Sequence, residues 1–108
     1  MIQLRNPGTL VIYGAMPSIM DMKTAIYSFG APEPSFITVA MIELDHYYKL
    51  LVYGTAGEVD AETIGEQTAV AATYQILLLA LSGAELIHGA GEIYQGKMVS
   101  PKFVVIGS

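Results

Sequence analysis

The sequence predicts an α/β fold in which short parallel strands alternate with helices. Three short apolar runs each end in a ring-bearing residue followed by glycine, and these ring-bearing residues are Tyr13, Tyr53 and His88. They lie 40 and then 35 positions apart, close to the span of one strand-helix unit, about 30 residues or more. The spacing predicts three repeats of strand, loop and helix, with the rings side by side at the carboxyl ends of parallel strands.

The first half of the chain is predicted to contain one strand and two helices. Residues 9–13 form a continuous β-branched and apolar run, as expected for a parallel strand covered on both faces. Residues 21–27 are predicted to form a short helix, with Ser18 or Asp21 as its cap. A longer helix is predicted for residues 33–48, since Pro34 suits a first helical turn and the acidic residue before it meets the positive end of the helix dipole.

The second half is predicted to contain one long apolar helix between two strands. Residues 50–53 form the second strand, and residues 54–63 form a flexible acidic loop. A helix begins near Gly65 and carries almost no charge after its first turn, so it is expected to be buried on most sides. We interpret it as a core helix rather than a membrane span, which needs about 20 predominantly apolar residues. Residues 85–88 form the third strand.

The composition indicates one domain with more apolar surface than it can cover alone. Hydrophobic residues make up 53% of the 108 residues and charged residues 14%, against about 45–50% and about 25% in an average soluble domain. A chain of this length also buries a smaller share of its surface than a larger domain does. The excess predicts a homo-oligomer or association with other segments of a larger fold.

Charge and residue usage exclude several classes of function. The net charge is −5 and the basic residues are scattered, which argues against a nucleic-acid groove or an anionic membrane surface. The absence of cysteine excludes disulfides, thiolate metal sites and cysteine nucleophiles. Neither an HExxH nor a GxSxG motif occurs, so no metal site or serine triad is expected. The first residues lack the apolar region of a signal peptide, and a cytoplasmic location is therefore expected.

The strand ends provide a set of polar side chains suited to a cationic ligand. In parallel α/β folds ligands bind beyond the carboxyl ends of the strands. The candidate substrate-binding residues are Tyr13, Asp21, Glu33, Tyr53, Asp60, Gln67 and His88. None has a basic residue directly beside it in the sequence, and ring faces attract ammonium groups by about 0.5–2 kcal/mol. The alternative is that the tyrosines are core rings, His88 is structural and Asp60 is a loop acid.

Several segments together resemble one known family. They are RNPGTLVIYGAMPSIMDMKTA at residues 5–25, YSFGAPE at 27–33, YGTAGEVD at 53–60, the pair at 66–67 and LSGAELIHGAG at 81–91. In this order and spacing they resemble the carboxyl-terminal part of the trimethylamine:corrinoid methyltransferase family. The likeness spans nearly the whole chain and depends on no single motif.

The resemblance implies both a fold and an activity. It implies that residues 1–108 are a single carboxyl-terminal fragment of a (β/α)8 TIM barrel, with about three to four parallel strands and intervening helices. It implies transfer of a methyl group from a quaternary or tertiary amine to the Co(I) of a partner corrinoid protein. Cobalamin would be carried by that partner rather than bound tightly here, and Gly89 and Gly91 are the expected cofactor contacts.

One departure from the family pattern indicates the branch. In the trimethylamine enzymes a pyrrolysine occupies the loop that corresponds to residues 60–65, and Thr63 stands near its place in this chain. The chain therefore resembles the non-pyrrolysine, glycine-betaine-type branch. Two alternatives stay open: a non-catalytic, self-associating α/β remnant, and a small-ligand module that binds anions through its glycine turns.

Overall fold

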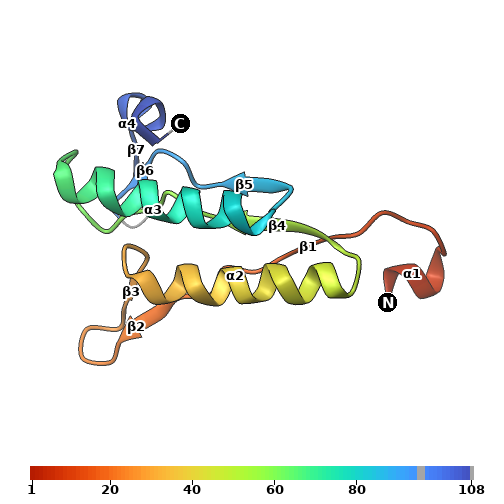
Figure 1. Cartoon of the computed structure of the whole chain (residues 1–108). Helices are drawn as coiled ribbons and strands as arrows, with labels where there is room; N and C mark the ends of the chain where they lie inside the picture. Colours follow the sequence, from red (N-terminus) through yellow and green to blue (C-terminus); the bar gives the residue numbers. More distant parts are fainter. Residues whose placement is uncertain (95–96, 108) are drawn as a thin grey trace.

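Strands and helices alternate along the chain, and two small antiparallel pairs are added to the predicted elements. In the computed structural model, residues 1–94 and 97–107 are described. The elements are α1 (Ile2–Arg5), β1 (Ile12–Gly14), β2 (Ile19–Asp21), β3 (Ile26–Ser28), α2 (Pro32–Tyr47), β4 (Leu51–Thr55), α3 (Glu66–Ser82), β5 (Leu86–His88), β6 (Glu92–Ile93), β7 (Met98–Val99) and α4 (Pro101–Gly107). Figure 1 shows α2 and α3 as two long neighbouring helices, with α1 and the β2–β3 hairpin projecting at the two ends of the view.

A parallel sheet forms the centre of the chain and confirms the predicted strand direction. Its strand order is β1-β4-β5, and both neighbouring pairs are parallel. Parallel neighbours need a crossover connection, and α2 lies in the connection from β1 to β4 while α3 lies in the connection from β4 to β5. The predicted α/β class is therefore present, with three parallel strands in sequential order among the described residues.

Both long helices pack against one face of this sheet. Ile42 of α2 and Leu79 of α3 form a buried cluster with Val52 of β4. A side chain added at Gly54 would meet the Leu79 side chain at 2.7 Å. Gly54 shares a face with Val52 because strand side chains alternate. The opposite face, which carries Tyr53, is left open by both helices.

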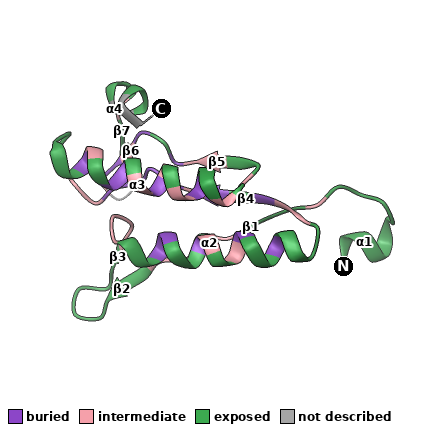
Figure 2. Cartoon of the chain, viewed as in Figure 1, coloured by how far each residue is buried: buried purple, intermediate pink, exposed green. Residues whose placement is uncertain are grey.

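The long helix α3 is buried along a single stripe. Its buried residues are Thr68, Ala71, Ala72, Gln75 and Leu79. On its other side Val70, Leu77 and Leu81 stay exposed, and Figure 2 shows buried and exposed segments alternating along α3. The prediction that this helix is buried on most sides is thus wrong for the chain alone, because the elements packed against it cover only one stripe. Among the described helices, α3 included, none combines the length and the apolar character that a membrane span requires.

The prediction of a short helix at residues 21–27 is wrong, because this segment forms the turn and second strand of a hairpin. β2 pairs with β3 in antiparallel register. The Asp21 carboxylate accepts hydrogen bonds from the backbone N–H of Lys23 at 2.9 Å and from the Thr24 hydroxyl at 3.1 Å. An aspartate that bonds the chain two residues on can begin a turn as readily as a helix. Ala25, with φ +55°, then ends any helical path.

The packing of the helices on the sheet gives a first testable prediction. Leu79→Ala is expected to lower the free energy of unfolding by about 2–5 kcal/mol, because the side chain is fully buried and its removal leaves a cavity. Leu81→Ala is the matched control, since Leu81 is 76% exposed on the same helix. Urea denaturation followed by circular dichroism measures both changes. Similar losses in the two variants would contradict the observed orientation of α3.

Candidate functional site

The open face of the sheet carries a pair of stacked rings. Tyr53 on β4 and His88 on β5 stack with ring centroids 4.5 Å apart and planes inclined by 7°. They share a face because Thr55 lies beside His88 in the register and Tyr53 is two residues before Thr55. The Thr55 hydroxyl lies 2.8 Å from His88 Nε2 and holds the imidazole in this orientation. Two of the three predicted rings therefore form one surface on neighbouring strands, with His88 at the carboxyl end of β5 and Tyr53 in the middle of β4.

The third predicted ring does not join this surface. Tyr13 lies beside Val52 in the register, and Gly14 lies beside Tyr53. Tyr13 therefore shares the helix-facing side of the sheet with Val52. The prediction that all three rings lie together is wrong, because a shift of one residue in register moves a side chain to the opposite face. Gly14 occupies the corresponding place on the open face, where a side chain would run into the Tyr53 ring. The glycine thus leaves room for that ring.

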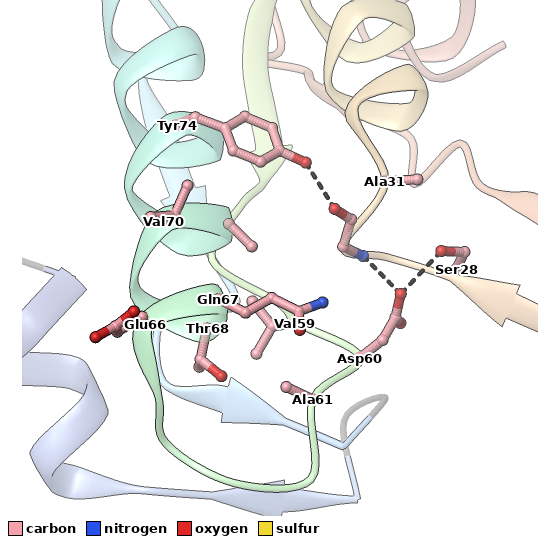
Figure 3. A pocket seen from close by; sticks show the side chains of 12 residues that line it. Ser28, Ala31, Val59, Asp60, Ala61, Glu66, Gln67, Thr68, Val70 and Tyr74 are labelled. Atoms are coloured by element: carbon pink, nitrogen blue, oxygen red, sulfur yellow. Dashed lines mark hydrogen bonds between the residues drawn. The ribbon is translucent and has the colours of Figure 1, made fainter.

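The Asp60 carboxylate joins two loops by hydrogen bonds and does not face the stacked rings. Its carboxylate accepts hydrogen bonds from the Ser28 hydroxyl at 2.8 Å, the Phe29 N–H at 2.9 Å and the Gly30 N–H at 3.0 Å. The Tyr74 hydroxyl donates to the Gly30 carbonyl at 2.8 Å, as Figure 3 shows. These bonds join the loop before α2 to the loop after β4 and to α3.

A groove of about 540 Å³ lies beside Asp60, between the first turns of α3 and the loop before α2. Gln67 and Glu66 line it together with Asp60 and the Tyr74 ring (Figure 3). The structure therefore brings together the predicted residues Asp60 and Gln67. This groove is separate from the stacked rings, since neither Tyr53 nor His88 lines it.

The remaining predicted acids lie away from the rings. Asp21 is exposed, and its carboxylate holds the hairpin turn. Glu33 is exposed in the first turn of α2. Neither side chain is grouped with Tyr53 and His88 by any contact among the described residues.

Gly89 and Gly91 both have left-handed backbone conformations, with φ of +94° and +95°. A side chain at Gly89 would press on the Ala56 carbonyl and on the Glu58 side chain, each at 3.1 Å. A side chain at Gly91 would run into Val104 of α4. The packing of the chain itself therefore accounts for both glycines, and their predicted cofactor contact stays a prediction.

Glu58, which no sequence motif singled out, is 5% exposed in the loop after β4. Burial raises the pKa of its carboxyl group from 4.5 to about 7, and the nearby negative charge of Glu92 adds to this effect. The loop had been expected to be flexible and acidic, but residues 56–59 are all buried. The apolar residues on both sides of Glu58 were the available signal, because an acid between small and apolar residues is a candidate for burial.

Gln75 of α3 holds this loop in place from inside. Its amide oxygen accepts a hydrogen bond from the Gly57 N–H at 2.8 Å. Its amide nitrogen donates to the carbonyls of Phe29 at 2.8 Å and Glu58 at 3.1 Å. Two backbone donors of this turn are therefore already bonded within the chain, the Gly57 N–H to Gln75 and the Ala56 N–H to the His88 carbonyl.

Comparison with known proteins identifies the family. The family model described as trimethylamine methyltransferase (MTTB) matches residues 1–106. A trimethylamine methyltransferase of Desulfitobacterium hafniense is 37% identical over 94 residues, which is 87% of this chain and 19% of that protein. One of Methanosarcina barkeri is 36% identical over 104 residues, or 96% of this chain and 21% of that protein. A glycine betaine methyltransferase of Desulfitobacterium hafniense is 29% identical over 102 residues, or 93% of this chain and 21% of that protein.

The matches cover almost all of this chain but only a small part of each relative. The chain spans about a fifth of the length of the curated relatives that it matches. Over that part, both the family model and the individual relatives agree with the likeness seen in the sequence motifs. The chain belongs to the trimethylamine methyltransferase family.

Proposed function

We propose that this chain forms one sector of the substrate mouth of a corrinoid-dependent amine methyltransferase. The observation that carries the proposal is the stack of Tyr53 on His88, on the open face of two neighbouring parallel strands, with His88 at the carboxyl end of β5. Ring faces attract methylated ammonium groups, whose charge is spread over apolar methyls. The substrate class is therefore a quaternary or tertiary amine, and the glycine-betaine type follows from the sequence around Thr63.

Sequential parallel strands with both crossover helices on one face support a place in a (β/α)8 barrel. In such a barrel the helices lie outside and the other face of each strand turns inward. Three strands cannot close a barrel of eight, so other segments or other copies of the chain would supply the rest. The exposed apolar residues on the open face, such as Ile12 at 49% and Leu86 at 51%, support such association.

The cobalamin would be carried by a partner protein, whose reduced cobalt would accept the methyl group. Gly89 and Gly91, the expected contacts with it, pack against Glu58 and Val104 of the chain itself. The contribution of this chain would be to bind and orient the amine: Thr55 fixes the imidazole, and the helix-covered face keeps water away from the back of the site.

The proposal separates two tyrosines that the sequence alone does not distinguish. Tyr53→Ala is expected to weaken binding of tetramethylammonium or glycine betaine by about 3- to 30-fold, because a ring face contributes about 0.5–2 kcal/mol. Tyr53→Phe should retain most of the affinity. Tyr13→Ala is the matched control, since that ring is similarly exposed but lies on the helix-facing side. Titration calorimetry measures all three variants.

Equal losses in Tyr53→Ala and Tyr13→Ala, or no binding of either cation by the unmodified chain, would contradict the proposed amine site. A methyl-transfer assay then tests the activity. The chain, alone and together with the other segments of a full-length relative, is incubated with a reduced corrinoid protein and quaternary amines. Amine-dependent methylation of the corrinoid is the expected result for the completed barrel.

A further inference from the structure

Glu58 is a buried acid without an ionic partner, close to the stacked rings. Glutamate is almost never fully buried unless it is paired. Within the described part of the chain, Glu58 forms no ion pair, and its carboxylate receives no hydrogen bond. Its side chain lies against Gly89, where an added Cβ would be 3.2 Å from the carboxylate oxygen. Gly89 directly follows His88, so the acid is next to the strand end that carries the stacked imidazole.

The surroundings of Glu58 disfavour its negative charge. The charged group that acts on it is Glu92 of β6, a like charge. The other titratable neighbours in these loops are Asp60, whose carboxylate is held by Ser28, Phe29 and Gly30, and His88, which is bonded to Thr55. Around Glu58, α2 contributes Ser35 and Thr38 and α3 contributes Gln75, none of which titrates. A buried carboxyl group beside a second acid and without a cation stays protonated more readily.

A small cavity lies beside Glu58. It has a volume of about 20 Å³, and Glu58 and Thr55 line it together with Gln75 of α3 and residues of the first turns of α2. This is enough for a single water molecule and too little for a methylated ammonium ion. Since the Thr55 hydroxyl also bonds His88, the cavity and the stacked rings share one residue. A cation would therefore lie on the rings, while Glu58 acts on it from the adjoining loop.

We propose that Glu58 is the counter-charge of the amine: its carboxyl group releases a proton to solvent when a quaternary ammonium ion binds against Tyr53 and His88. This inference rests on the proposed function and assigns the negative charge to a residue other than Asp60. A nearby cation favours the ionised carboxylate, and the ionised carboxylate in turn favours the cation. Amine binding therefore becomes coupled to pH through one buried group.

The test is a titration of the glutamate side-chain carboxyl carbons by NMR on the labelled 108-residue chain, with tetramethylammonium chloride as the probe. Without the probe, the Glu58 signal is expected to titrate with a midpoint near 7. With the probe at saturation, the midpoint should fall by about one pH unit or more. Sodium chloride at the same ionic strength is the control and should leave the midpoint in place. Triple-resonance assignment identifies the signal without a variant, and Glu58→Gln should remove it.

The outcomes separate this inference from the proposed function. If the probe shifts the Tyr53 and His88 ring signals but leaves the Glu58 midpoint unchanged, the amine site stands and the counter-charge inference is overturned. A Glu58 midpoint below 5 in the empty chain overturns it as well. If the ring signals do not respond to the probe, the proposed amine site itself fails. Glu92→Gln is expected to lower the Glu58 midpoint without the probe, because it removes the neighbouring like charge.

Discussion

Gln75→Leu is expected to lower the free energy of unfolding by about 3–5 kcal/mol. The Gln75 side chain is 4% exposed and bonds three backbone groups, the Gly57 N–H and the carbonyls of Phe29 and Glu58. Leucine fills a similar volume but bonds none of them, and each buried backbone group left unpaired costs about 1–3 kcal/mol. Urea denaturation followed by circular dichroism measures the loss.

Gln67→Leu is the matched control for this change. Gln67 lies on the same helix but is exposed in its first turn, so its replacement should alter the free energy of unfolding by less than about 0.5 kcal/mol. A loss below about 1 kcal/mol for Gln75→Leu would mean that the three backbone groups find other partners. In that case the loop after β4 would not depend on α3 for its conformation.

Glu58→Gln is expected to stabilise the chain at alkaline pH and to change little at acidic pH. Folding raises the pKa of Glu58 from 4.5 to about 7, so the folded chain binds this proton more tightly than the unfolded chain does. Stability from this group is then fully present below pH 4.5 and is lost as the pH rises to about 7. The total loss is about 3 kcal/mol, at about 1.4 kcal/mol per pH unit. Glutamine stays neutral and avoids the loss.

Denaturation at pH 4.5, 6 and 8 measures the difference between the two proteins. The free energy of unfolding of the variant, relative to that of the unmodified chain, should rise across this range, so that the variant is the more stable protein at pH 8. Glu62→Gln removes a charge from an exposed position in the same loop and is expected to stay within about 0.5 kcal/mol of the unmodified chain at each pH. A constant difference between Glu58→Gln and the unmodified chain would show that Glu58 does not titrate in this range on folding.

The strands and long helices could be predicted because their signals are local. Short apolar runs bounded by glycines predicted β1, β4 and β5, and a nearly uncharged stretch predicted α3. The hairpin at residues 19–28 could not be separated from a helix in this way. Its opening aspartate is favoured in both structures, and the choice depended on the pairing of β2 with β3.

The candidate site was predicted in part. Tyr53 and His88 were expected together and do stack, because the register pairs Thr55 with His88 and Tyr53 lies two residues earlier on the same face. Tyr13 was expected with them and lies on the other face, since a shift of one residue in register reverses the side of every residue. Spacing along the chain gives the length of a repeat, but it does not give the register between strands.

By itself, the sequence determined the α/β class, the order of the main elements, the family and the supply of rings and acids at the strand ends. Only the tertiary structure decided which of these groups meet. Asp60 accepts a hydrogen bond from Ser28, 32 positions away, and its carboxylate therefore joins two loops. Glu58 is buried because Gly89 and Gln75, which come later in the chain, pack against it. Burial and register depend on contacts between distant segments, and no local pattern of residues specifies them.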